Sequence, residues 1–272
     1  MFGIGLAFAF GIMRIVNVAH GEIVVMSAYI GMTLLATLPI PPLLLVLPVG
    51  LISFALGWAL QGVLLNRVLS SDPLPPMLLT FGLAIVIRNA LVQIYGADVR
   101  AIQVGELQLA GVPVFGLTIG VFPLLVFGLA LALYAALHWL MARTALGRIL
   151  RATADDREVV QLCGVNCHRT YCAAMGLAVA LSSIAGLLMA MRSSMSPFSG
   201  ADRLLIAFET VIIGGLGSIW GTLAGGLVLG VAQLVGLKLN PNSGMLLAHG
   251  VFFVLLLLMP RGIAGWRKRG AR

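Results

Sequence analysis

The 272-residue chain is too apolar for a soluble domain, because 60% of its residues are hydrophobic, 10% are charged and its mean hydropathy is +1.08. Soluble domains average about 45–50% apolar and about 25% charged residues. The net charge of +8 does not indicate nucleic-acid binding, since the basic residues lie in short gaps between apolar runs and form no polar face. We therefore expect one membrane-embedded domain over residues 1–272, with membrane lipid as its surroundings.

Eight apolar runs follow one another between charged or proline-rich breaks. A helical span needs about 20 apolar residues, whereas barrel strands alternate with a period of two. The runs are continuous, which favours helices. The predicted fold is an all-α membrane protein with about eight transmembrane helices, including broken or re-entrant segments. The runs cover residues 1–13, 22–38, 43–65, 77–95, 119–141, 170–191, 204–237 and 245–260.

The first run, residues 1–13, is too short to cross a membrane unaided. No basic segment precedes it and no A-x-A site follows it, so a signal peptide is not expected. An interrupted helix or a start further upstream, with a truncated N-terminus here, is expected instead. Asn17, His20 and Glu22 follow as a polar cluster. Asn17 and Glu22 could cap the next helix, the cluster could contact a solute, or His20 and Glu22 could relay protons.

Arg88 and Asn89 lie in the middle of the run 77–95. An arginine at that depth costs at least about 2.5 kcal/mol on the lenient insertion scale. It should therefore face a helix end, a water-filled cavity or a carboxylate, and Glu209 is a candidate partner. A packing clamp between helices and a place in a transport pathway are both open interpretations.

A basic loop over residues 142–169 and a basic tail over residues 261–272 predict the orientation of the chain. By the positive-inside rule both should be cytoplasmic, and residues 96–118 should lie outside. Within the loop, Asp155 or Asp156 can cap a short helix that runs to about Cys163 and stops at Gly164 in a left-handed conformation.

That short helix combines mixed charge with an apolar face of Val159, Val160 and Leu162. Such an amphipathic helix, parallel to the membrane, suits docking to a soluble partner. The nearby Cys163, Cys167 and Cys172 have spacings that fit no common metal site, so reduced thiols and no metal are expected. The candidate docking residues are Asp155, Asp156, Arg157, Glu158, Leu162 and Gly164.

The run 204–237 is too long for one span, and its middle carries Gly214, Gly215, Gly217 and Ser218. Glycines there permit a sharp turn, so a broken or re-entrant helix is predicted. This break and the one before residue 20 occupy corresponding positions in the two halves. Paired interrupted helices indicate inverted repeats around a transport pathway.

The chain has no P-loop, because Lys238 and Lys268 lack the flanking Gly and Ser/Thr. Ser218 lacks the glycine two residues earlier that a nucleophile elbow needs, since Leu216 stands there. We therefore expect a transport subunit that is not an enzyme and has no cofactor of its own. The candidate pathway residues are Asn17, His20, Glu22, Arg88, Asn89, Glu209, Gly214, Gly215, Gly217 and Ser218.

Four ordered blocks carry a resemblance to a known family. They are MRIVNVAHGEIVVMSAYIGM, ALGRILRATADDREVVQLCGVN, VIIGGLGSIWGTLAGGLVLGVAQ and MPRGIAGW. The chain resembles the permease subunits of branched-chain amino acid ABC importers, and its N-x-A-H-G-E block is similar to that of the H-type subunit. The resemblance covers almost the whole chain.

This resemblance implies a bacterial inner-membrane heterodimer with an M-type permease. It further implies two cytoplasmic subunits that bind ATP and an extracytoplasmic solute-binding protein, with residues 155–164 as the coupling helix. Two positions depart from the family: Glu209 stands where a neutral residue is usual, and Ile206 where a lysine is common. Urea and short-amide permeases share the N-x-A-H-G-E block, so they are an alternative. A proton-coupled secondary transporter using His20/Glu22 and Arg88/Glu209 is another.

Overall fold

The computed structural model describes residues 1–69, 72–108, 110–114 and 117–267. In the described part of the chain, six helical segments are long and apolar enough to cross a membrane. This is fewer than the eight expected, because α1 has 12 residues, α2 begins with polar residues and α10 has 15. The six segments are Pro42–Val68, Leu74–Tyr95, Val121–Arg143, Cys167–Arg192, Ile219–Leu239 and Gly244–Gly265.

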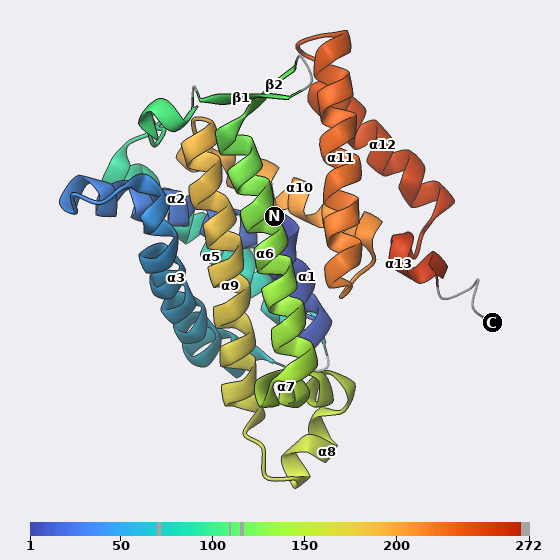
Figure 1. Cartoon of the computed structure of the whole chain (residues 1–272). Coiled ribbons are helices and arrows are strands. Elements are labelled where there is room, and N and C mark those ends of the chain that lie inside the picture. Colours follow the sequence, from blue (N-terminus) through green and yellow to red (C-terminus); the bar gives the residue numbers. More distant parts are fainter. Residues whose placement is uncertain (70–71, 109, 115–116, 268–272) are drawn as a thin grey trace.

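The helices follow the predicted apolar runs closely (Figure 1). The first half holds α1 (Phe2–Met13), α2 (His20–Thr37), η1 (Pro42–Leu45), α3 (Val46–Leu60), the π-helical turn η2 (Gln61–Leu65), α4 (Asn66–Val68) and α5 (Leu74–Tyr95). Then come η3 (Gly105–Gln108), β1 (Gly111–Val114), β2 (Leu117–Gly120), α6 (Val121–Arg143), α7 (Ala145–Asp155), α8 (Arg157–Leu162) and α9 (Cys167–Arg192). The last part holds η4 (Pro197–Ser199), α10 (Gly200–Gly214), α11 (Ile219–Leu239), α12 (Gly244–Leu258) and α13 (Gly262–Arg267).

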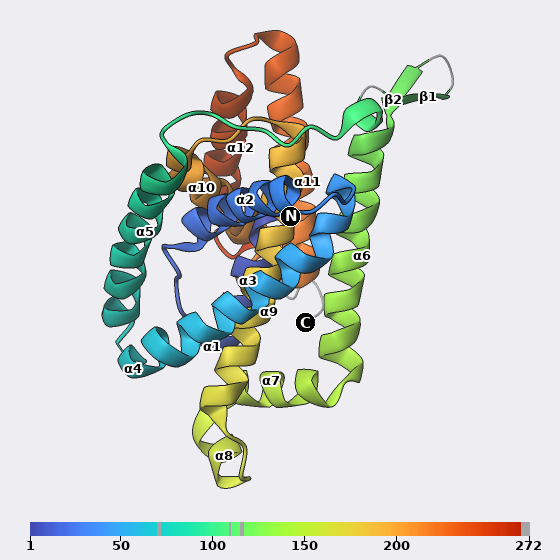
Figure 2. The same ribbon diagram turned by 90° about the vertical axis from the view of Figure 1, so that its left-hand side faces the viewer.

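Helix α9 is the centre of the bundle and packs against α1, α2 and α3 (Figures 1 and 2). Small residues let these backbones approach closely, as is usual for helices in lipid. A Cβ added at Gly176 would press on Phe54 of α3, and one at Gly186 would collide with the Val24 carbonyl of α2. The outer helices instead expose large apolar side chains such as Leu51, which is 71% exposed. These are surfaces for lipid or for partner subunits.

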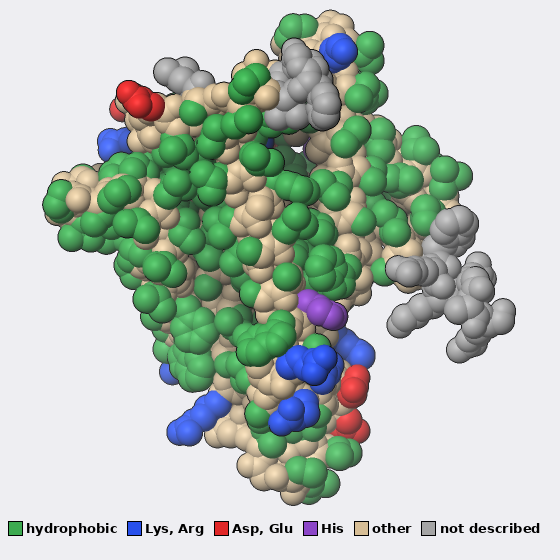
Figure 3. Space-filling model, in the orientation of Figure 1, with side chains coloured by type: hydrophobic (Ala, Val, Ile, Leu, Met, Phe, Trp, Pro, Cys, Tyr) green, Lys and Arg blue, Asp and Glu red, His purple; other side chains and the backbone are tan. Residues whose placement is uncertain are grey.

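The two ends of the bundle differ in structure. At one end α7 runs across the ends of α6 and α9, and α8 projects beyond it (Figure 2). At the other end β1 and β2 form a small antiparallel hairpin that the sequence analysis did not predict, with Gly111 opposite Gly120. Lys and Arg side chains gather at the α7–α8 end (Figure 3), which by the positive-inside rule is expected to be cytoplasmic.

Candidate functional site

The first polar cluster lies in the connection between α1 and α2. α1 ends at Arg14, whose backbone is left-handed with φ 54°. The Asn17 side chain then turns the chain, because its Oδ1 accepts a hydrogen bond from the Ala19 amide at 3.0 Å. Asn17 therefore shapes the turn before α2, whose N-cap is Ala19 and has no side-chain cap bond. Glu22 does not cap this helix, because its carboxylate is taken up by another partner.

That partner is Arg88 of α5. Arg88 Nε donates to Glu22 Oε1 at 3.0 Å, and Arg88 Nη2 contacts the same oxygen. The Glu22 side chain is 3% exposed and that of Arg88 is 35% exposed. Because α5 packs against α2, the expected pairing of Arg88 with Glu209 is wrong. Glu209 instead meets His249 of α12, with 2.5 Å between Oε1 and Nδ1.

The Glu22 carboxylate also lies against the first residue of α10. A Cβ added at Gly200 would collide with the Glu22 carboxylate, and one at Gly21 would collide with the Gly200 carbonyl. A carboxylate at the N-terminus of a 15-residue helix is favourable, since the unpaired backbone N–H groups there carry partial positive charge. The first turns of α2 and α10 thus meet at one buried acid, whose Oε2 has no hydrogen-bond partner among the described residues.

His20 and Asn89 do not join this ion pair. The buried His20 ring contacts the Phe2 carbonyl through Nε2 at 2.9 Å, away from Glu22. Asn89 is exposed and its side chain donates to the Ile85 carbonyl one turn earlier, at 2.8 Å. The described contacts therefore contain no direct His20–Glu22 link of the kind that a proton relay would use.

The predicted break in the run 204–237 is confirmed between α10 and α11. Gly215 and Gly217 have φ values of 95° and 79°, a region that favours glycine. Ser218 begins α11, since its Oγ accepts from the Gly221 amide at 3.1 Å. A Cβ added at Gly217 would lie 3.2 Å from the Gly11 Cα, which is tighter than an ordinary van der Waals contact, so the loop packs closely against α1.

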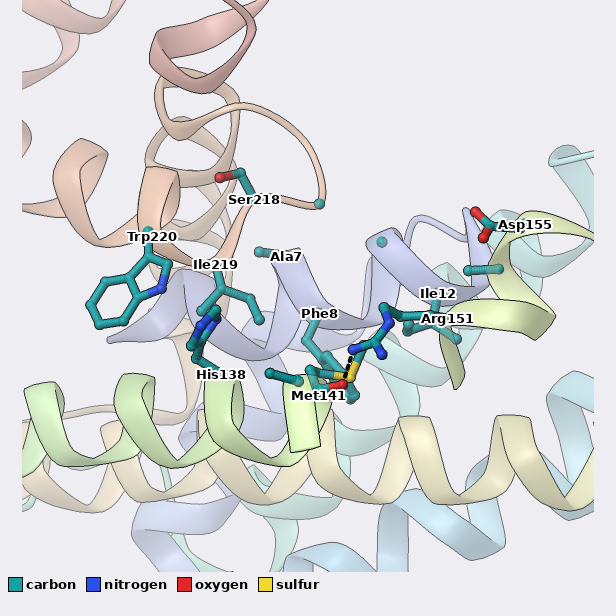
Figure 4. A pocket seen from close by; sticks show the side chains of 14 residues that line it. Ala7, Phe8, Ile12, His138, Met141, Arg151, Asp155, Ser218, Ile219 and Trp220 are labelled. Atoms are coloured by element: carbon teal, nitrogen blue, oxygen red, sulfur yellow. Dashed lines mark hydrogen bonds between the residues drawn. The ribbon is translucent and has the colours of Figure 1, made fainter. Parts of the chain in front are cut away.

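A cavity of about 410 Å³ lies beside this break (Figure 4). Arg151 and Asp155 line it from α7, and Ser218 and Trp220 line it from the start of α11. His138 of α6 packs edge-on against Trp220, with 5.7 Å between the ring centroids. The cavity therefore separates the basic helix α7 from the broken helix, with α1 forming part of its wall.

Three residues of this cavity were not predicted from the sequence: His138, Trp220 and Arg151. Arg151 was expected only to belong to the basic loop that sets the topology. Each residue comes from a different helix, and none belongs to a local motif. No spacing in the sequence could have brought them together. The pairing of Glu209 with His249 was missed for the same reason, although the rarity of acids and histidines in apolar runs is a usable signal.

The predicted short helix in the basic loop is confirmed as α8. Asp156, not Asp155, is its N-cap, because Asp156 Oδ1 accepts from the Glu158 and Val159 amides at 2.9 and 3.1 Å. Gly164 ends it with φ 82°, as expected. Asp155 instead ends α7 and is exposed, as is Glu158.

The apolar face of α8 differs from the predicted one. Val160 is buried, whereas Val159 is 54% and Leu162 is 88% exposed. Arg157 is half-buried, and its guanidinium lies 5.7 Å from the centre of the Tyr171 ring of α9. Val160 and Arg157 therefore anchor α8 to the bundle, and Leu162 projects from it.

This arrangement is that of a multi-span membrane permease: an apolar helical bundle with two polar breaks and a rigid helix that projects from its basic end. The chain belongs to the family described as "Branched-chain amino acid transport system / permease component", which matches residues 1–260. With six apolar spans among its described residues, it is a multi-pass protein of the inner membrane.

Individual relatives cover nearly the whole chain. It is 27% identical over 97% of its length to the high-affinity branched-chain amino acid transport system permease protein BraD of Pseudomonas aeruginosa, covering 91% of that protein. It is equally 27% identical to LivH of Escherichia coli, covering 90% of that protein. It is 31% identical to the fructose import permease protein FrcC of Rhizobium meliloti over 94% of this chain and 72% of the relative. No solved structure matches at a significant level.

Proposed function

We propose that this chain is the H-type permease subunit of an ATP-driven importer that carries branched-chain amino acids inward. It pairs with an M-type permease, two ATP-binding subunits dock on its cytoplasmic end and on its partner's, and an extracytoplasmic protein delivers the solute. ATP is then bound by the docked subunits, and this chain supplies the path across the membrane.

The geometry of α8 carries this proposal. A helix fixed at one end by Asp156 and at the other by Gly164 holds Leu162 away from the bundle, 88% exposed. A six-residue helix with such defined ends is a rigid projection, and an exposed leucine among charged residues suits a groove on a soluble partner. The sequence block around it is one of those that resemble the family.

Movement of α8 can reach the broken helix through a series of packed helices. α8 follows α7 directly, and α7 is packed tightly on the end of α6, because a Cβ at Gly147 would collide with the Leu140 and Met141 carbonyls. α7 also contacts α1, which presses on the loop at Gly217. We propose that ATP-driven movement of α8 changes the cavity between α7 and α11 and so shifts the loop 215–218 between two states.

The two polar breaks are the proposed solute pathway. Each follows a short helix, α1 or α10, and each precedes a longer one, which supports the inverted-repeat interpretation. Glu22 joins the two halves at Gly200. The pathway residues proposed from the sequence lie mainly around Glu22 and Arg88 and around the loop 215–218, while Glu209 lies apart from both, beside His249.

A proton-coupled secondary transporter is the second candidate, because the structure brings an acid and a histidine together at Glu209 and His249. The two candidates separate in one assay. Uptake that stops when a proton ionophore is added, while ATP stays high, would favour proton coupling. Uptake that follows ATP would favour the importer. Urea and short amides are alternative solutes, and one relative of this chain is named for fructose import.

The importer predicts a defined response to changes at Leu162. Leu162→Asp should lower ATP-binding-subunit docking at least about tenfold, because it places a charge in an apolar contact. Leu162→Met keeps the volume and apolar character and should leave docking unchanged. Docking is measured by co-purification and by solute-stimulated ATPase activity in proteoliposomes. Since Leu162 is 88% exposed, neither change should affect membrane insertion. Equal ATPase stimulation in the two variants would rule out α8 as the docking helix.

A further inference from the structure

A second cavity lies between the start of α1 and helices α10, α11 and α12, and its lining includes neither Glu22, Arg88 nor the loop 215–218. Its volume is about 180 Å³. Glu209 of α10, His249 of α12 and Gln233 of α11 supply its polar wall, and Ile206, Leu229 and Met245 supply much of its apolar wall. A single small solute with one polar end fits a cavity of this size and lining.

The polar wall carries unused hydrogen-bonding capacity. The Glu209 carboxylate is 4% exposed and bonds to His249 through Oε1 alone among the described residues, so Oε2 is free to accept. Gln233 uses its amide Nε2 only on the Met245 sulfur, at 3.7 Å, and sulfur is a weak acceptor. The wall thus offers a strong acceptor on one side and an available N–H donor on another.

The ionisable groups of the cavity select the kind of polar end. No Lys or Arg side chain lines it; the Glu209 carboxylate, the His249 imidazole that pairs with it and the Met1 amino terminus do. The unbonded oxygen of a carboxylate in a low-dielectric site favours a cation that also donates hydrogen bonds, and an ammonium group does both. The Gln233 amide can donate to a carboxylate. An ammonium, a carboxylate and an aliphatic body together define an aliphatic α-amino acid.

We propose that this cavity is a binding site within the permease for an aliphatic amino acid in transit. Its ammonium group binds Glu209, its carboxylate binds Gln233, and its side chain packs against Ile206, Leu229 and Met245. The inference rests on the proposed import of branched-chain amino acids, and it gives a function to the buried acid Glu209. Binding must be weak enough to release the solute, which suits a site of one charged contact.

The test measures retention of tritiated leucine by the detergent-solubilised permease complex in the absence of the solute-binding protein. Glu209→Gln should lower the affinity for leucine by about tenfold or more, since it removes a charge-assisted hydrogen bond. Glu106→Gln removes an exposed carboxylate from η3, outside the cavity, and should leave affinity unchanged. 4-Methylpentanoate, which lacks the ammonium group, should displace leucine poorly.

A second variant tests the same site if the complex with Glu209→Gln fails to assemble. Gln233→Leu removes only a weak bond to sulfur, so folding is not at stake. It should weaken leucine binding while sparing leucinamide, which keeps the ammonium and lacks the carboxylate. A merely structural role for Gln233 would affect both ligands equally.

The outcomes also separate this proposal from the proposed function. Leucine that is imported by the complete system, but held equally well by Glu209→Gln and by the unaltered complex, would overturn the cavity proposal and leave the importer intact. Leucine that is neither imported nor retained, in a complex that imports urea or acetamide, would overturn both.

Discussion

Glu22 is a buried acid that links three helices. Its carboxylate binds Arg88 of α5 and lies against Gly200 at the start of α10, while only 3% of its side chain is exposed. From the sequence, Arg88 is a costly intramembrane charge and Glu22 belongs to a polar cluster, but nothing in the sequence pairs them. Partner choice depends on which helices pack together, and neither the spacing nor the composition of the runs contains that information. Glu209 was therefore assigned to the wrong cation.

The contact between Glu22 and Gly200 predicts that alanine destabilises the protein at position 200 but not at an open glycine position. Gly200→Ala should destabilise the protein by about 1–3 kcal/mol, because the new Cβ must displace a buried carboxylate. Gly128→Ala in α6 adds the same methyl group where nothing lies within 4 Å and should be neutral or stabilising. Thermal unfolding of both variants in detergent checks this; equal melting temperatures would show that Gly200 is not in contact.

Removing the cation of the Arg88–Glu22 pair should lower the stability of the protein more than replacing both partners does. Arg88→Met leaves a buried carboxylate without its cation and should cost about 3 kcal/mol, the low end for such a change because Arg88 is partly accessible. Adding Glu22→Gln should restore part of that loss. A double-mutant cycle of unfolding measured in detergent gives the coupling, and strictly additive losses would mean that the pair does not interact.

Among the elements, those set by local signals were predicted best. The apolar runs locate the long helices, the glycine-rich stretch locates the break before Ser218, and Asp156 and Gly164 locate the ends of α8. Each of these signals acts within a few residues. The β1–β2 hairpin and the crossing of α7 beneath the bundle were not predicted, because both depend on contacts with distant segments.

The left-handed end of α8 gives a prediction for the element as a whole. Gly164 has φ 82° and nothing within 4 Å of an added Cβ, so backbone strain alone decides the effect of a substitution. Gly164→Val should cost about 1–2 kcal/mol locally and loosen α8, whereas Gly164→Asn should be tolerated, since Asn enters this conformation more readily. We expect the valine variant alone to lose solute-stimulated ATPase activity while inserting normally. Full stimulation in Gly164→Val would show that the end of α8 need not be rigid.

At the scale of the whole molecule, the chain has a buried centre and a poorly buried periphery. The span containing α9 is 72% buried, whereas that of α12 is 11% buried and those of α3, α5 and α6 are each 22% buried. A bundle with this distribution has wide apolar surfaces available for lipid and for a second permease. The sequence could predict that the chain is membrane-embedded, but not which helix forms its centre, because the mean hydropathy of the α9 span, 2.0, lies within the 1.6–2.3 range of the six described spans.

The importer is tested most directly by asking which chains accompany this one. A tagged chain is purified from detergent-solubilised membranes, and the co-purifying chains are identified by mass spectrometry. If the chain is an importer subunit, two ATP-binding subunits and a second permease should co-purify with it. The ATP-binding subunits should be lost in Leu162→Asp and kept in Leu162→Met. Recovery of this chain alone, still able to transport a solute after reconstitution, would contradict the importer and favour the proton-coupled transporter.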